Sequence, residues 1–362
     1  MTVMTECASR RADLVARFSE LKIDGLFVSS LPNVRYLTGF TGSNGLLLLT
    51  PDRATFFTDP RYTLQAAREV DCRVRAATGP ALPRVAAQAA KKKIRRLGFE
   101  RGRISFDTHD ALRSLLPLGA ALRPVAGQVE RLRMRKSPAE IETIRAAVAI
   151  NSEAFEQGIR AITPNMTESG LAAEIEYRMR HLGVDKPSFE TIVAAGELSA
   201  LQHASPGSSP LGGGLVLIDM GATLRGYSSD MTRMLFLGRP GRRVKELYKA
   251  VLEAQLAAID AVRPGVSAGS VDRAARRVLA KHGLDKAFLH STGHGIGLEI
   301  HEPPRLGKRE KTLLETGMAI TIEPGAYIEG FGGVRIEDTV VVTASGCEIL
   351  TPTPKALRVS SC

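Results

Sequence analysis

The chain of 362 residues has few cysteines and no long apolar segment, and both absences exclude classes of protein. Its four cysteines, Cys7, Cys72, Cys347 and Cys362, have neither the spacing of a zinc site nor that of a disulfide framework, so we expect reduced thiols in a cytoplasmic protein. Apolar runs such as residues 46–49 are far too short to span a membrane. The first twenty residues contain acidic side chains, which a signal peptide would lack, so we expect a soluble protein.

The sequence also lacks the pattern of a nucleic-acid surface, although its formal net charge is +11. Residues 1–131 hold 21 Lys and Arg against 12 Asp and Glu, a balance of +9, whereas residues 132–362 hold 28 against 26, a balance of +2. The densest basic stretch, residues 91–96, has no aromatic side chain for base stacking before Phe99. We interpret this stretch as a solvated helix end and expect no nucleic-acid partner.

The length and the pattern of apolar residues predict two domains. Residues 1–131 alternate helical and strand-like segments, which indicates an α/β domain. The expected elements include a helix over residues 12–21, a strand over 25–29, a hairpin over 45–58, a helix opened by 59–62 and a strand over 104–107. The second domain, residues 132–362, begins with a long helix whose start is a capping box at Ser137 and Glu140.

An internal repeat with an offset of 100 residues organises the second domain. Residues 161–183 align with residues 261–283, and the alignment superposes Gly183 on Gly283. Each copy follows a longer helix and precedes a pair of strands that carry acidic residues, so we expect two related helix–helix–hairpin halves. Such halves would form a curved, largely antiparallel sheet with helices on its outer face.

Histidines and carboxylates in this domain predict a metal centre. Three of the seven histidines lie within residues 290–301, and the glycines around His294 leave its imidazole uncrowded, which suits a metal ligand. Four acidic residues lie where a strand would place a core side chain: Asp219, Asp230, Glu323 and Glu337. A carboxylate is costly to bury unless it is paired or binds a metal. These four and His294 carry about four negative charges, which two divalent cations would neutralise.

The chemistry of this ligand set narrows the choice of metal. Oxygen and nitrogen ligands without thiolate are compatible with cobalt, zinc or iron, and the excess of carboxylate favours Mn2+. Two such ions about 3.5–4 Å apart can activate a water and polarise a carbonyl group. The sequence therefore predicts two divalent metal ions, which we expect to be Mn2+.

The motifs that hold these residues, DMGA, GYSSD, GHGIGLEIHE, EPG and RIED, resemble those of the Xaa-Pro aminopeptidases and Xaa-Pro dipeptidases (prolidases). These are pita-bread metallopeptidases related to methionine aminopeptidase. The resemblance runs from about residue 134 to residue 358, and less sharply through NVRYLTGFTGSNG and DPRYTLQA near the N-terminus. It implies an N-terminal creatinase/prolidase-type α/β domain, which can limit substrate length, and a pita-bread catalytic domain.

The resemblance also implies roles for individual residues. Asp219 would bind one metal and His294 the other, Asp230 and Glu337 would bridge the two, and Glu323 would bind the second metal and accept a proton from the attacking water. His203 and His301 match positions that stabilise the tetrahedral intermediate.

Two further residues, His290 and Arg335, match positions that line the proline side of the site or steady the ligands. Arg335 lies two residues before Glu337 on one expected strand, so their side chains would share a face and form an ion pair. Gln202 replaces a proline that many relatives have, which leaves the loop before His203 less rigid.

The first expectation for function is an Xaa-Pro aminopeptidase, because the TGFTGSNG and DPRY strings look more like those of the aminopeptidases. The alternative is an Xaa-Pro dipeptidase, which requires a free carboxylate directly after proline. A third possibility is a non-catalytic binding module, since some relatives keep the fold after losing ligands, but all five ligands are present here. We expect short peptides with proline in second position as substrates, no membrane partner, and a homodimer, because relatives are often dimers.

Overall fold

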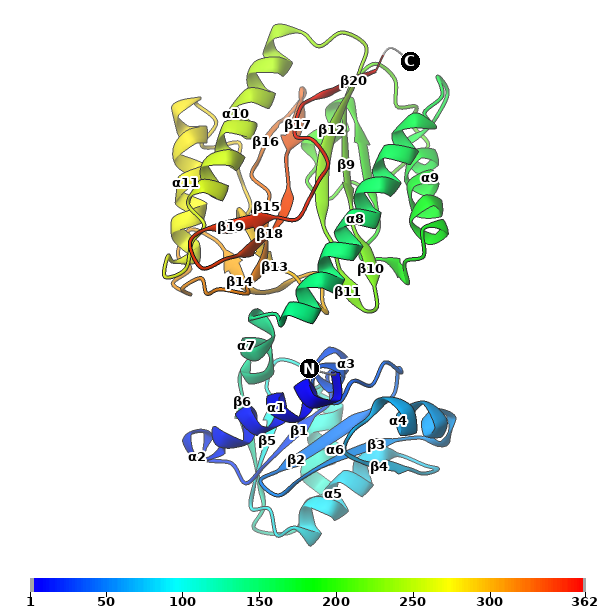
Figure 1. Cartoon of the computed structure of the whole chain (residues 1–362), viewed down its shortest axis with the longest axis vertical. Coiled ribbons are helices and arrows are strands. Elements are labelled where there is room, and N and C mark those ends of the chain that lie inside the picture. Colours follow the sequence, from blue (N-terminus) through cyan, green and yellow to red (C-terminus); the bar gives the residue numbers. More distant parts are fainter. Residues whose placement is uncertain (1–2, 361–362) are drawn as a thin grey trace. The chain divides into compact units, whose positions relative to one another are not determined.

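The computed structural model describes residues 3–360, which form two compact units divided between Arg133 and Met134 (Figure 1). The boundary expected after residue 131 lies inside helix α7 (Gln128–Met134). None of the helices in the described part of the chain has the length and apolar character needed to cross a membrane. Three of the cysteines are free thiols, and Cys362 lies outside the described residues.

The N-terminal unit is built on a six-stranded mixed sheet with the strand order β4-β3-β2-β1-β5-β6. Its strands are β1 (Gly25–Val28), β2 (Leu46–Thr50), β3 (Arg53–Thr58), β4 (Arg73–Ala76), β5 (Arg96–Glu100) and β6 (Ala121–Val125). Its other helices are α1 (Val3–Ala16), α2 (Phe18–Leu21), α3 (Leu31–Thr38), α4 (Thr63–Glu69), α5 (Ala81–Lys91) and α6 (Phe106–Leu115), with a 3-10 turn η1 (Pro60–Tyr62). The predicted hairpin is confirmed, because β2 and β3 pair antiparallel. Phe27, Leu48 and Phe57 of the sheet pack against Val85 of α5 in the core of this unit.

Two elements expected in this unit differ from the structure. The helix expected over residues 12–21 is divided between α1 and α2, and α2 is terminated by its C-cap residue Lys22, whose φ of 54° is left-handed. The strand expected over residues 104–107 is wrong. The Ser105 side chain accepts a hydrogen bond from the Thr108 backbone N–H, so it caps the N-terminus of α6.

The C-terminal unit contains the predicted repeat. Its helices are α8 (Pro138–Arg160), α9 (Glu168–His181), α10 (Arg242–Asp260) and α11 (Ala268–Lys281). Helices α9 and α11 have 14 residues each and start 100 residues apart, as the alignment requires. The predicted capping box is confirmed, since Ser137 and Glu140 exchange hydrogen bonds at the start of α8. Figure 1 shows α8 and α9 on one side of the strands of this unit and α10 and α11 on the other.

The strands of the C-terminal unit form four sheets, and their pairs are antiparallel except that of β12 with β20. The two larger sheets have the orders β20-β12-β9-β8 and β14-β13-β15-β18-β19. Their strands are β8 (Ile192–Ala195), β9 (Gly214–Met220), β12 (Met231–Leu237), β13 (Gly293–Gly295), β14 (Glu302–Leu306), β15 (Ala319–Ile322), β18 (Asp338–Val342), β19 (Cys347–Ile349) and β20 (Arg358–Ser360). The smaller sheets contain β7 (Lys186–Pro187), β10 (Ala222–Leu224), β11 (Tyr227–Ser228), β16 (Gly325–Ile328) and β17 (Gly332–Arg335), and a 3-10 turn η2 (Gly196–Ala200) follows β8.

A backbone hydrogen bond connects the two halves of this unit at their ligand-bearing ends. The Glu337 backbone N–H donates a hydrogen bond of 3.2 Å to the Thr232 carbonyl, where β12 of the first half begins and β18 of the second half is about to begin. The antiparallel pair β9 and β12 and the antiparallel pair β15 and β18 therefore meet at one seam.

Candidate metal centre

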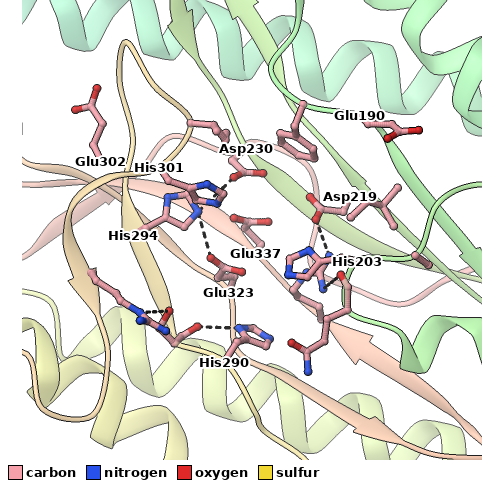
Figure 2. Close-up of a pocket in the computed structure, with 18 of the residues that line it drawn as sticks. Glu190, His203, Asp219, Asp230, His290, His294, His301, Glu302, Glu323 and Glu337 are labelled. Carbon is pink, nitrogen blue, oxygen red and sulfur yellow. Dashed lines mark hydrogen bonds and ion pairs between the residues drawn. The ribbon is translucent and has the colours of Figure 1, made fainter. Parts of the chain in front are cut away.

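The five expected ligands lie at the ends of four strands and on β13, and their side chains converge (Figure 2). Asp219 is on β9 and Asp230 directly precedes β12, while Glu323 directly follows β15 and Glu337 directly precedes β18. The two halves thus deliver their carboxylates from corresponding places. His294 is the central residue of β13, which pairs with β15.

The inner cluster is compact enough for a metal ion. One ligand atom each of Asp230, His294 and Glu337 lies within 4.8 Å of the others. The His294 Nε2 atom is 3.3 Å from Glu323 Oε1 and 3.6 Å from Asp230 Oδ2. A single small cation placed among these atoms could contact several of them.

The protonation of His294 makes its Nε2 atom an acceptor that faces other acceptors. Its Nδ1 atom lies 3.0 Å from the Gly295 carbonyl, which can only accept, so Nδ1 carries the proton in the neutral ring. Burial lowers the pKa of His294, which keeps the ring neutral. A lone pair on Nε2 thus points towards carboxylate oxygens, and a cation would relieve this arrangement.

Two carboxylate oxygens support the same conclusion. Asp219 Oδ1 and Glu337 Oε1 are buried and have no hydrogen-bond partner among the residues that the structure describes. An unpaired buried polar atom is costly, and a carboxylate oxygen most of all. The donor set of carboxylates and one imidazole therefore fits divalent metal ions, with these oxygens as ligands.

The electrostatics of the centre reflect crowded negative charge. Burial first, and then repulsion from neighbouring carboxylates, raises the pKa of Asp230 and of Glu337 well above the usual range. Burial also raises the pKa of Glu323 to about 7. A divalent cation would reverse these shifts, because it favours the ionised form of each ligand.

Arg335 approaches the ligands differently from the sequence-based expectation. The predicted ion pair with Glu337 is wrong, because Arg335 Nη2 pairs with Asp219 Oδ2 at 2.6 Å. The reason is that Arg335 ends β17 and Glu337 precedes β18, so the two residues do not alternate along one strand. Arg335 Nε instead donates to Thr232 Oγ1 (2.9 Å), which donates in turn to Glu337 Oε2 (2.7 Å).

A chain of hydrogen bonds connects Arg335 with His290 through Tyr327. Arg335 Nη1 donates to the Tyr327 hydroxyl (2.9 Å), and that hydroxyl lies 2.9 Å from His290 Nε2. His290 Nδ1 is 2.8 Å from the Ser291 carbonyl, so Nδ1 donates and Nε2 accepts from Tyr327. Burial lowers the pKa of His290 to about 4, which keeps this direction of the hydrogen bonds at neutral pH.

A cavity of about 850 Å³ opens at the centre and contains all of the expected site residues in its wall. They are Asp219, Asp230, His294, Glu323, Glu337, His203, His301, His290 and Arg335. His203 and His301 are the exposed members, and the His301 ring packs edge-on against the His294 ring with centroids 4.4 Å apart. The Gln202 carbonyl accepts a hydrogen bond of 3.3 Å from Arg335, which connects the loop before His203 to the site.

Sequence reasoning missed three residues of this site. Tyr327 could have been suspected, because a buried tyrosine needs a partner for its hydroxyl. No feature of the sequence marks Thr232 as part of the site. Arg305 lies on β14 directly opposite His294 on β13, and only the pairing of these strands reveals that the two are neighbours.

The chain matches known proteins over nearly its whole length. The family described as "Metallopeptidase family M24" matches residues 142–344, and "Creatinase/Prolidase N-terminal domain" matches residues 10–135. An Xaa-Pro dipeptidase of Pyrococcus furiosus is 36% identical over 96% of this chain and 99% of its own length. A solved structure of an Xaa-Pro dipeptidase from Bacillus anthracis has a TM-score of 0.95 at 38% identity, covering 98% of this chain and 100% of that one. An X-Pro aminopeptidase from Thermotoga maritima has a TM-score of 0.89 at 35% identity, covering 97% and 100%.

Proposed function

Because the chain belongs to metallopeptidase family M24, a family of pita-bread enzymes, we propose that it is an Xaa-Pro dipeptidase that hydrolyses the bond before a C-terminal proline. This reverses the order of the sequence-based expectations, which placed the aminopeptidase first on two short N-terminal strings. Relatives named Xaa-Pro dipeptidase that match 96% and 98% of the chain support the change. The observation that carries the proposal is the position of Arg305.

Arg305 offers a cation where a dipeptide would place its free carboxylate. Directly paired residues on antiparallel strands project to the same face, so the Arg305 side chain shares the face of His294 and lines the cavity. Arg305 is exposed, and its Nε donates to Ser291 Oγ at 3.2 Å. The terminal guanidinium nitrogens have no partner among the described residues and can bind a carboxylate in the bidentate manner. A longer peptide has a neutral amide at this point, so it would lose that interaction.

In the proposed mechanism, other residues of the cavity wall bind the metal ions, transfer the proton and stabilise the oxyanion. Two divalent cations held by Asp219, Asp230, His294, Glu323 and Glu337 would lower the pKa of a bound water and polarise the scissile carbonyl. Glu323 would take a proton from the attacking water and pass it to the proline nitrogen as the carbon–nitrogen bond breaks. His301, whose pKa burial lowers, would stay neutral and donate a hydrogen bond to the developing oxyanion. His203 would contribute a second hydrogen bond to this oxyanion.

A comparison of Gly-Pro with Gly-Pro-amide tests the dipeptidase proposal, because the amide removes only the negative charge. We expect kcat/KM of the manganese-loaded enzyme to be at least about tenfold higher for Gly-Pro, since a charged hydrogen-bonded pair contributes about 1.5–3 kcal/mol. Arg305→Gln should remove this preference, mainly by raising KM for Gly-Pro. The control is Arg309→Gln, which changes an exposed arginine outside the cavity wall. Cleavage of Gly-Pro-amide and Gly-Pro-Ala by the parent that is as efficient as cleavage of Gly-Pro would favour the aminopeptidase instead.

Removal of a proposed bridging ligand tests the metal chemistry separately. We expect Asp230→Ala to abolish hydrolysis while the far-UV circular dichroism stays that of the parent, and chelation of the parent to have the same effect. Turnover retained by Asp230→Ala would rule out a binuclear mechanism. No cleavage by the parent with either Mn2+ or Co2+ would favour a non-catalytic binding module.

A further inference from the structure

A second buried cluster of charges lies directly behind the candidate metal centre. Its centre is Arg233, which is 2% exposed. Arg233 is the largest of the fully buried side chains in the described part of the chain. Arg233 Nη2 pairs with Asp338 Oδ1 at 2.7 Å, and both side chains are almost completely buried. Asp338 Oδ2 accepts from Gln255 (2.7 Å) and pairs with Lys355. None of these residues belongs to the cavity wall.

All five N–H donors of Arg233 have acceptors, and the acceptors come from three parts of the chain. Nη1 donates to the carbonyls of Thr232 (3.0 Å) and Glu337 (2.5 Å), which lie on the two sides of the seam between the halves. Nη2 donates to Asp338 and to the Thr353 carbonyl (2.6 Å), and Nε donates to the Pro354 carbonyl (3.2 Å). The guanidinium therefore connects the first half, the second half and the C-terminal segment formed by residues 353–355.

The cluster lies next to the backbone that carries the proposed ligands. Thr232 pairs with Asp219 across β9 and β12, so Thr232 faces the metal centre and Arg233, the next residue, faces away from it. On the other side of the seam, Asp338 follows Glu337. Next to it, the Thr339 hydroxyl donates to the Asp230 carbonyl at 3.0 Å. The cluster thus touches the backbone of Glu337 directly, and it is connected to the backbone of Asp230 through Thr339, the residue after Asp338.

We propose that Arg233 is a positioning residue that sets the spacing between the two ligand-bearing halves and thereby the affinity for the second of two divalent cations. The inference rests on the proposed binuclear centre. Each half contributes one of the bridging carboxylates, so a shift at the seam changes the distance between Asp230 and Glu337 without touching either side chain. The Thr353 and Pro354 carbonyls accept hydrogen bonds from the guanidinium, and Lys355 pairs with Asp338, so the C-terminal segment takes part in the same arrangement.

The number of donors that Arg233 uses is more than a merely stabilising ion pair requires. A buried ion pair is weak evidence for stability, because the cost of desolvating both charges offsets much of their attraction. Arginine is the side chain that offers five donors in a fixed plane, whereas lysine offers three from one atom. Arg233→Lys keeps the charge next to Asp338 but cannot satisfy both seam carbonyls and both carbonyls of the C-terminal segment. The conservative variant therefore separates charge from geometry.

The test is a Co2+ titration of the metal-free full-length protein, followed by calorimetry and by the visible absorption of the bound Co2+. We expect the parent to bind two Co2+ ions. Arg233→Lys should keep the first site and lose affinity at the second by roughly 10–100-fold, the size of effect seen when outer partners of metal ligands are removed. Its Co2+ spectrum should resemble that of the parent loaded with one equivalent. Parent-like affinity at both sites in Arg233→Lys would overturn the proposal.

Two further variants keep the test decisive. Arg133→Lys is the matched control, because Arg133 is 3% exposed and donates to Asn33 Oδ1 (2.7 Å) in the N-terminal unit. It should lower stability and leave the Co2+ titration unchanged, and an equal loss of Co2+ affinity would reduce the effect of Arg233 to general destabilisation. If Arg233→Lys does not fold, Lys355→Met should weaken the second site in the same direction, and an unchanged second site would refute the idea.

The readout also separates this inference from the proposed function. A parent that binds two Co2+ ions and fails to cleave Gly-Pro would refute the dipeptidase and leave the role of Arg233 to the titration of its variants. A parent that binds a single Co2+ ion with full peptidase activity would refute the role of Arg233 and leave the dipeptidase in place.

Discussion

At the scale of single residues, the carboxylates of the candidate metal centre depend on charges that the chain itself does not supply. Burial and mutual repulsion raise the pKa values of Asp230 and Glu337, and burial raises that of Glu323 to about 7. The folded, metal-free protein therefore holds protons that an unfolded chain would release above about pH 4.5. The free energy of unfolding of the metal-free protein should consequently fall as the pH rises from about 4.5 to about 7.

Because carboxyl groups of the centre bind protons in the metal-free protein, we expect metal binding to depend on pH. A divalent cation must displace the proton on Glu323, so the affinity should rise by about tenfold between about pH 6 and about pH 8, with release of protons. Calorimetry with Mn2+ in two buffers of different ionisation enthalpy would measure both effects. Glu323→Gln removes this proton and should flatten the dependence. An affinity of the parent that is the same at both pH values would contradict the assignment.

At the scale of secondary-structure elements, the two halves use the same helix pair with different side chains at one contact. Gly158 of α8 faces Ile175 of α9, and a Cβ atom at position 158 would lie 2.6 Å from Ile175 Cγ1. The equivalent positions in the second half, 100 residues later, are Ala258 and Ala275, and both are fully buried. At this helix contact, the first half therefore pairs a glycine with a large isoleucine side chain. The second half pairs two small alanine side chains.

This complementarity predicts a coupled pair of substitutions. Gly158→Ala should destabilise the protein by about 1–3 kcal/mol through overpacking, although alanine is the better helix former. Ile175→Ala should cost about 2–5 kcal/mol by leaving a cavity. The double variant should lose less than the sum by about 0.5–3 kcal/mol, because each change relieves the defect of the other. Urea denaturation of the four proteins measures this coupling, and strict additivity would show that the two positions do not form a tight contact.

At the scale of the whole molecule, the proposed metal ions would connect the two halves of the C-terminal unit, since each half contributes two carboxylates. Ligands that bind only the folded state stabilise it, by about 2.7 kcal/mol when the free ligand is at 100 times its Kd. We therefore expect chelation to lower the melting temperature, and Mn2+ restored in excess to raise it again. Asp230→Ala should show little of this dependence. A melting temperature of the parent that is insensitive to chelator would argue against two resident ions.

The sequence by itself determined the family, the repeat and the set of proposed ligands. Carboxylates inside apolar strand segments and a glycine-flanked His294 are local signals, and the 100-residue repeat appears in helices α9 and α11 at the expected places. These features could be predicted because periodicity and motifs need only neighbours along the chain. The homodimer and the choice of metal stay predictions.

The tertiary structure alone decided which side chains meet. It pairs Arg335 with Asp219, 116 residues away, and sets Arg305 opposite His294. It also brings the Glu337 and Thr353 carbonyls, 104 and 120 residues from Arg233, to one guanidinium. Such partners depend on strand register and on where each strand ends. The expected pair of Arg335 with Glu337 failed for this reason, because a residue two positions along the chain shares a face only while the strand continues.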